Sequence, residues 1–175
     1  MERSQRRRRS GLAALAVAAA SVVGGSGPSA LVAAAEAGPP SWAKLKALVG
    51  EWSGMYEGQP ARVSYRLVSN GTALLETLET PDSSEMLTLY HPDGGVLVLT
   101  HYCSLGNQTR MRAKELPGGR LDFGYLDATN LKSADEHRMT RLVLGFPDAD
   151  HLVQEWTSRT GKTDQVARFE FARRK

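Results

Sequence analysis

The sequence predicts an all-β fold: an up-and-down antiparallel β-barrel of about ten strands, preceded by one short N-terminal helix. Helical periodicity ends at Gly50, and short segments of alternating apolar and polar residues then follow one another to the C-terminus. Turn signals such as Asn70-Gly71, residues 92–95 and residues 160–162 separate these segments. A meander of so many strands leaves unpaired edges unless the sheet closes, so we expect a barrel.

The helix is expected immediately before the first strand. Ser41 follows two prolines that stiffen the entry, and its hydroxyl can cap the helix N-terminus. Trp42, Leu45 and Leu48 recur at helical spacing, and Gly50 is the expected stop. These signals predict one short helix at the start of the folded domain.

The strands are expected between the turn signals, with alternation of period two in each segment. One irregular stretch, residues 127–136, is expected to form a loop at one rim of the barrel. The expected strands are residues 51–57, 61–69, 72–80, 84–91, 95–103, 108–116, 120–126, 137–146, 150–158 and 164–172.

The first hairpin predicts which side chains face the barrel interior. A two-residue turn at Asn70-Gly71 places Tyr65 opposite Glu76 on one face and Arg62 opposite Glu79 on the other. The charged pair fixes its face toward water, so we expect Tyr65 and Glu76 to point inward.

The later hairpins extend this assignment. A turn over residues 92–95 pairs Tyr90 with Leu97, Thr88 with Leu99 and Met86 with His101, and the next turn pairs Cys103 with Thr109 and His101 with Met111. Arg110, Arg112 and Lys114 share the opposite face, so His101 and Cys103 are expected inside.

At the C-terminus, Leu152, Gln154 and Trp156 are expected inside, opposite Phe171, Phe169 and Ala167. For residues 120–126, a simple turn puts Phe123 and Tyr125 outside, whereas a bulge near Pro117 reverses them; both remain open.

The N-terminal segment has the layout of a secretory signal peptide. A basic start is followed by an apolar run over residues 12–23 and by small-residue cleavage sites near Ala37. We therefore expect a signal peptide over 1–37, a barrel domain over 38–175, and export to the periplasm or beyond. The alternative is an uncleaved anchor, although the run is shorter than the about 20 residues that span a membrane; after cleavage, no stable membrane anchor is expected.

Composition and charge narrow the function further. With 41% hydrophobic and 23% charged residues, the 175-residue chain is neither disordered nor fibrous. Five of its 22 basic residues and two of its 19 acidic residues lie in 1–37, so the remaining domain is neutral and no nucleic-acid partner is expected. Cys103 is the single cysteine, so the domain is expected to be stable without an internal disulfide.

Residues Gly50-Glu51-Trp52, which open the first strand, resemble the G-x-W signature of the calycin superfamily of lipocalins, fatty-acid-binding proteins and nitrobindin-like barrels. The resemblance implies that Trp52 plugs one end of the barrel and that Arg173, on the last strand, stacks on it. The segments LVGEWSG, VSYRLVSNGTALLETLE, MLTLYH, LVLTHYCSLGNQTRMRA and HLVQEW further resemble an exported bacterial lipocalin-like family. This second resemblance covers most of residues 42–175, implies a calycin-type barrel and transfers no catalytic residues.

The predicted register gathers polar groups inside an apolar barrel. A buried carboxylate must be protonated, paired or hydrated, so Glu76 marks a candidate site unless a one-residue slip exposes it. His101 and Cys103 lie about 7 Å apart on one strand face, near enough to contact one ligand, although both are also ordinary interior residues. The expected pocket has polar groups at Tyr65, Glu76, Thr88, His101 and Cys103, and apolar walls at Met86, Leu99 and Met111.

Three functions fit this pattern. The preferred one is an exported barrel that binds a small, mainly apolar molecule and recognises its one polar end near Glu76 and His101. The second is an enzyme that uses His101 as a base or Cys103 as a nucleophile. The third is a structural or stress-related envelope domain with a filled core.

The cofactor stays open at this point. A zinc site would need a third ligand, such as His137 or Glu76, and the sequence has no metal-binding motif. Haem held by His101, by analogy with nitrobindin, likewise has no further motif to support it.

Overall fold

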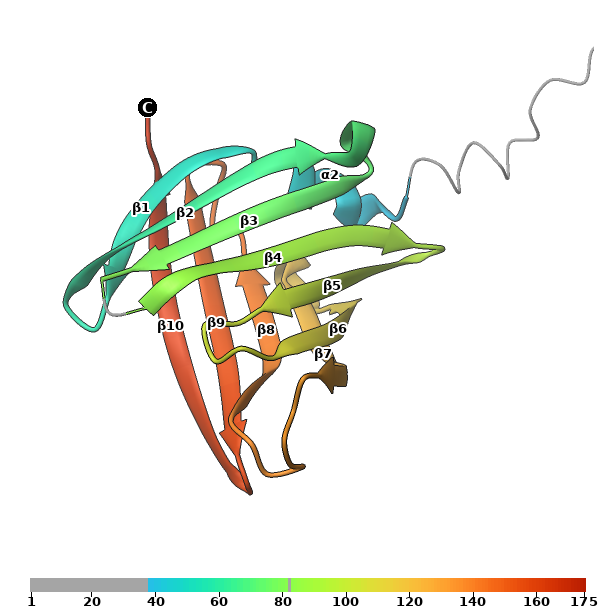
Figure 1. Cartoon of the computed structure of the whole chain (residues 1–175). Helices are drawn as coiled ribbons and strands as arrows, with labels where there is room; N and C mark the ends of the chain where they lie inside the picture. The colour runs from blue at the N-terminus through green and yellow to red at the C-terminus, as the bar shows by residue number, and fades with distance from the viewer. Residues whose placement is uncertain (1–37, 82) are drawn as a thin grey trace, which may run out of the picture.

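The computed structural model describes residues 38–81 and 83–175, and these residues form the expected closed barrel of ten antiparallel strands. Each strand pairs with its sequence neighbours, and the first strand, β1, pairs with the last, β10, which closes the sheet (Figure 1). One short helix precedes β1, as expected. The predicted signal peptide, residues 1–37, lies outside the described residues.

The strand boundaries lie close to those expected from the turn signals. Helix α2 spans Pro40–Lys46, and short 3₁₀ turns occupy Ser69–Gly71 (η1) and Pro117–Gly119 (η2). None of the described helices is long and apolar enough to cross a membrane. The strands are β1 Gly50–Tyr56, β2 Gln59–Val68, β3 Ala73–Thr80, β4 Ser83–Asp93, β5 Val96–Tyr102, β6 Gln108–Glu115, β7 Leu121–Thr129, β8 Arg138–Gly145, β9 His151–Thr160 and β10 Thr163–Arg173.

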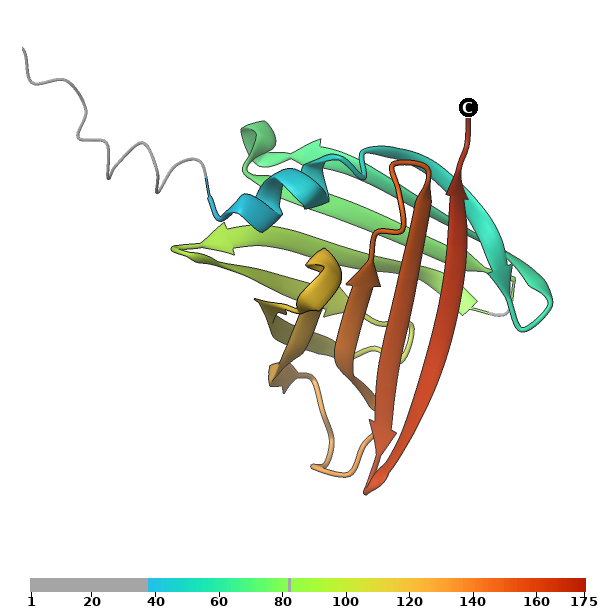
Figure 2. The ribbon, with the colours of Figure 1, turned by 180° about the vertical axis from the view of Figure 1, so that it is seen from behind.

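Helix α2 packs against one end of the barrel (Figure 2). Trp42, Leu45 and Leu48 are buried in the same apolar core as the strands, but the helix ends at Lys46 rather than at the expected stop Gly50, and Leu48 lies in the turn that follows it. The expected cap was wrong: Pro39 occupies the N-cap position, Pro40 begins the helix, and no side chain caps it. Proline fits the first helical turn because its missing N–H would have no intrahelical partner there.

The same end of the barrel is closed by Trp52 and Arg173. Trp52 is 1% exposed, and the Arg173 guanidinium carbon lies 4.1 Å from the centre of its ring. Arg173 also donates to the carbonyl oxygens of Ala47 at 2.7 Å and Val49 at 2.9 Å. The last strand is thereby tied to the segment that joins α2 to β1.

The first hairpin has the predicted register. Tyr65 pairs with Glu76 and Arg62 with Glu79, and both Tyr65 and Glu76 are buried. At the C-terminus, Gln154 pairs with Phe169 and Trp156 with Ala167, again as expected. In both hairpins, the charged residues correctly identified the face of the sheet that points to solvent.

The register of the central strands was wrong by two residues. Thr88 pairs with His101 rather than with Leu99, because the turn at Gly94 and Gly95 is centred one residue later than the expected turn over 92–95. His101 pairs with Thr109 rather than Met111, because Cys103 lies in the following turn and not in β5. A shift of two residues leaves every side chain on its expected face.

Strand β7 follows the alternative with a bulge near Pro117 at Phe123 but not at Tyr125. Phe123 is fully buried opposite Ala113, whereas Tyr125 is 40% exposed. A register shift opposite Arg110 and Met111 leaves Leu126 as an extra residue, so a further bulge lies at the end of β7 that is far from Pro117.

The paired length of neighbouring strands varies around the barrel. Strand β9 pairs with β10 over residues 151–160 and 163–172, whereas β7 pairs with β8 over 121–124 and 141–144. Residues 130–137 form the loop between β7 and β8, and β7 extends through part of the stretch expected to be irregular. Asp122 reinforces the short junction by accepting two hydrogen bonds from Arg141, at 2.6 and 3.0 Å.

Candidate functional site

A cavity of about 210 Å³ lies at the end of the barrel opposite α2 and is open on one side. Its wall is mostly apolar, with aromatic and methionine side chains from several strands. The largest of these are Tyr56, Met86, Met139, Trp156 and Phe169. Its imidazole and thiol groups are His101, His137 and Cys103.

Beneath the cavity, Glu76 is fully buried and accepts four hydrogen bonds. Oε2 accepts from the Tyr65 hydroxyl at 2.7 Å, the Tyr90 hydroxyl at 2.8 Å and Gln154 Nε2 at 3.0 Å. Oε1 accepts from the Thr88 hydroxyl at 3.1 Å. Burial raises the pKa of Glu76, and the four donors act in the opposite direction. Four donors on two oxygens are the surroundings of a carboxylate.

Two further hydrogen bonds extend the network to Trp156 at the cavity wall. Gln154 Nε2 also donates to the Tyr65 hydroxyl at 2.6 Å, and Trp156 Nε1 donates to Gln154 Oε1 at 2.9 Å. The ring of Trp156 lies 4.5 Å from that of His101 between centroids. The buried network therefore reaches the cavity at both His101 and Trp156.

His101 joins the network through Thr88, because its Nδ1 lies 3.0 Å from the Thr88 hydroxyl oxygen. The single hydroxyl hydrogen of Thr88 is directed to Glu76 Oε1, which has no other donor among the described residues. The hydrogen between His101 and Thr88 must then come from Nδ1, and this assignment leaves Nε2 as an acceptor.

That acceptor has no partner. Nε2 of His101 is buried without a hydrogen bond to any described residue, although the ring lines the cavity. Desolvation lowers the pKa of His101 from 6.5 to about 4, so the ring is neutral near pH 7. A buried polar atom without a partner is costly, and a ligand that donates a hydrogen bond would remove that cost.

The structure divides the predicted site residues into two groups. Met86, His101 and Cys103 line the cavity, whereas Tyr65, Glu76 and Thr88 lie in the network beneath it. Leu99 and Met111 are fully buried and do not line the cavity. Burial raises the pKa of the Cys103 thiol, which keeps it protonated near neutral pH.

Sequence reasoning missed two participants in the network and the wall residues Tyr56, Met139, Trp156 and Phe169. Tyr90 and Gln154 were placed on inward faces but not recognised as partners of Glu76, and Trp156 was not recognised as a cavity wall. The alternation of side chains along a strand could have revealed the network residues. Tyr90 lies two residues from the inward residue Thr88, and Gln154 lies midway between the inward residues Leu152 and Trp156. A polar residue at such a position requires a buried partner.

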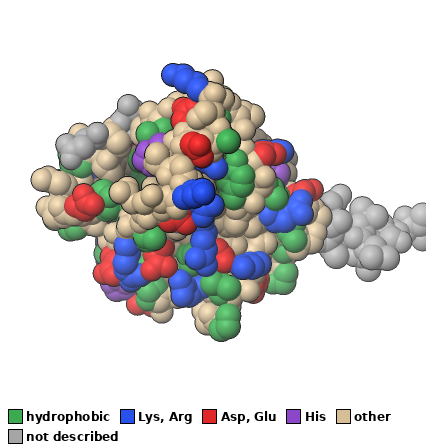
Figure 3. Space-filling model, turned by 90° about the horizontal axis from the view of Figure 1, so that it is seen from below, with side chains coloured by type: hydrophobic (Ala, Val, Ile, Leu, Met, Phe, Trp, Pro, Cys, Tyr) green, Lys and Arg blue, Asp and Glu red, His purple; other side chains and the backbone are tan. Residues whose placement is uncertain are grey.

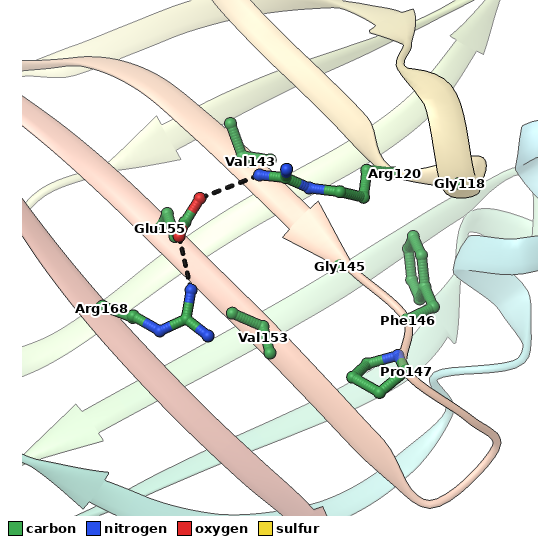
Figure 4. Close-up of a pocket in the computed structure, with 9 residues that line it drawn as sticks. All are labelled: Gly118, Arg120, Val143, Gly145, Phe146, Pro147, Val153, Glu155 and Arg168. Carbon is green, nitrogen blue, oxygen red and sulfur yellow. Dashed lines mark hydrogen bonds and ion pairs between the residues drawn. The ribbon is translucent and has the colours of Figure 1, made fainter.

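A second, larger hollow of about 360 Å³ lies on the outer face of β8, β9 and β10 (Figure 4). Its two arginines, Arg120 and Arg168, both donate to Glu155, at 3.0 and 2.5 Å. Figure 3 shows acidic and basic side chains interleaved on the surface seen from below. Because the charges in the outer hollow are already paired, we place the candidate site in the barrel cavity.

The cavity does not have the residues of a metal centre. Among residues 38–81 and 83–175, no three His, Cys, Asp or Glu side chains are grouped to hold a metal ion. His101 Nε2 is the type of atom that binds haem iron, and the cavity of about 210 Å³ is smaller than sites for drug-sized molecules.

Comparison with known proteins supports the fold. No family model matches the chain, and a search of curated proteins found no match. A crystal structure of Rv2717c from M. tuberculosis is similar over 78% of this chain and 98% of that chain, with a TM-score of 0.53 and 18% sequence identity. At that identity the similarity concerns the fold alone: the chain is a closed ten-strand antiparallel barrel.

Proposed function

We propose that this protein binds a small, mainly apolar molecule with one polar end in the cavity opposite α2. The observation that carries the proposal is His101 Nε2, an unpartnered buried acceptor in the wall of an open apolar cavity. Apolar walls with a few fixed polar groups are typical of small-molecule sites. We further propose that binding occurs after export, in the periplasm or outside the cell, because residues 1–37 have the pattern of a signal peptide.

Two pKa shifts favour binding over catalysis. The relay from His101 through Thr88 to Glu76 resembles the arrangement that orients a general base, which is the reason to keep an enzyme as the second candidate. However, a base is most effective with a pKa near the working pH, and the pKa of His101 is lowered to about 4. The raised pKa of Cys103 likewise opposes nucleophilic attack near pH 7. The open cavity also argues against a filled structural core.

The proposal can be tested by filling the cavity. Ligand-observed NMR would measure the binding of benzyl alcohol, p-cresol, hexanol and hexanoate to the wild-type protein and to Met86→Trp, whose indole would occupy the cavity. Met55→Trp is the matched control, because Met55 is 55% exposed on β1 and does not line the cavity. We expect at least one compound to bind the wild type and the control but not Met86→Trp. Equal binding to a folded Met86→Trp, or no binding of any compound to the wild type, would refute the proposal.

A further inference from the structure

The hydrogen-bond directions around His101 define which polar group could pair with its Nε2 atom. Thr88 is the sole described donor to Glu76 Oε1, so reversing its hydroxyl toward His101 would leave a buried carboxylate oxygen bare. The cost of that reversal holds the hydrogen on Nδ1 and the lone pair on Nε2. The vacant partner of Nε2 is therefore a donor, an O–H or N–H group.

The charge of the lining excludes the usual clamp for an anion. None of the described residues that line the cavity is Lys, Arg, Asp or Glu. Arg138, next to the lining residue His137, donates to the carbonyl oxygens of Ala134 and Glu136, and its guanidinium lies over the ring of Tyr125. The neutral His101 ring provides no positive charge near pH 7. A carboxylate or phosphate would thus be buried without a lysine or arginine to pair with it, which is unfavourable.

The wall of the cavity favours a flat, apolar body. Tyr56 stacks on Phe169 at 4.5 Å between ring centroids, and Trp156 presents a third aromatic ring beside His101. Met86 and Met139 add polarizable sulfur atoms, which pack well against rings. The volume of about 210 Å³ is below that of sites for drug-sized molecules. The lining therefore suits a single ring better than a long chain.

We infer that the molecule bound here is a neutral aromatic compound with one hydrogen-bond donor, of the phenol class, whose O–H or N–H bonds to His101 Nε2. This inference rests on the proposed function and narrows it from any small apolar ligand to one chemistry. It also distinguishes this cavity from one that binds a fatty acid, whose carboxylate would require a positive charge.

Four matched probes test the inference at pH 7.5: p-cresol as a donor, 4-methylanisole as an acceptor, toluene without a polar group, and p-toluate as an anion. Titration calorimetry would give their dissociation constants for the wild type, for His101→Phe and for the control His91→Phe, whose residue lies outside the lining. One buried hydrogen bond should make p-cresol bind about tenfold more tightly than toluene or 4-methylanisole. His101→Phe should remove that advantage and keep toluene binding, whereas His91→Phe should change neither.

A measurement on the wild type keeps the test independent of how well His101→Phe folds. The ¹⁵N resonance of His101 Nε2 should be that of an unprotonated imidazole nitrogen and should move on addition of p-cresol but not of toluene. Equal affinity for p-cresol and toluene, tighter binding of 4-methylanisole or p-toluate, or a protonated Nε2 would overturn the inference while the proposed function stood. Absence of binding by all four probes would overturn both.

Discussion

Acidification should weaken the fold through His101, which is 1% exposed and has a pKa lowered by desolvation to about 4. The unfolded chain binds a proton at this residue near pH 6.5, so between pH 6.5 and 4 it holds more protons than the folded protein. The stability contributed by the neutral buried ring is therefore complete above pH 6.5 and is lost as the pH falls toward 4. Between pH 7 and pH 5 the loss amounts to about 2 kcal/mol.

The measurement compares wild type with His101→Phe, because Glu76 titrates in the opposite sense. Burial raises the pKa of Glu76, so the contribution of Glu76 to the free energy of unfolding decreases as the pH rises above the ordinary pKa of a glutamate. This pH dependence is common to both proteins. Urea unfolding at pH 7 and pH 5, followed by circular dichroism, would give the free energy of unfolding of each. We expect the wild type to lose about 2 kcal/mol more than the variant. Equal losses, or an NMR titration of His101 near its ordinary pKa, would refute the reasoning.

Three further predictions concern the network, the thiol and the closed end of the barrel. Glu76→Ala should lower the free energy of unfolding by roughly 3 kcal/mol or more, because it leaves four buried donors unpaired, whereas Glu79→Ala on the outer face should have little effect in the same urea assay. Iodoacetamide at pH 7 should alkylate Cys103 far more slowly in the folded protein than in urea, since burial raises the pKa of its thiol; mass spectrometry showing similar rates would contradict this. Arg173→Ala should destabilise the protein by about 2 kcal/mol through the lost contact with the indole and the lost hydrogen bonds, and thermal unfolding should show a smaller effect for Arg174→Ala. A loss of similar size in both variants would show that these contacts contribute little.

Sequence reasoning succeeded where a charge or an apolar stripe identified the face of a strand. Arg62 opposite Glu79 fixed the wet side of the first hairpin and so placed Glu76 in the interior. The two-residue error in the register of β4 and β5 preserved every face, because side chains alternate with a period of two. For this reason the inward residues were predicted even where their partners were not.

The division between cavity and network could not be predicted from the sequence. Glu76 and His101 were both expected in the pocket, yet one is covered by hydroxyl and amide donors and the other reaches the cavity. That distinction depends on position along the barrel axis and on the partners supplied by β4 and β9, which are distant in the sequence. The bulge at Leu126 likewise has no local turn signal, because it arises in the middle of a strand pair.

The short junction between β7 and β8 has a kinetic consequence. Few backbone hydrogen bonds hold residues 121–124 to 141–144, so we expect their amide hydrogens to exchange with solvent through local opening of this strand pair. The amide hydrogens between β9 and β10 should exchange only through global unfolding. The loop over residues 130–137 connects β7 and β8 and carries His137, which lines the cavity. Local opening of this strand pair would therefore move the loop. The residence time of a bound ligand would then depend on the rate at which the β7–β8 pair opens rather than on the stability of the whole barrel.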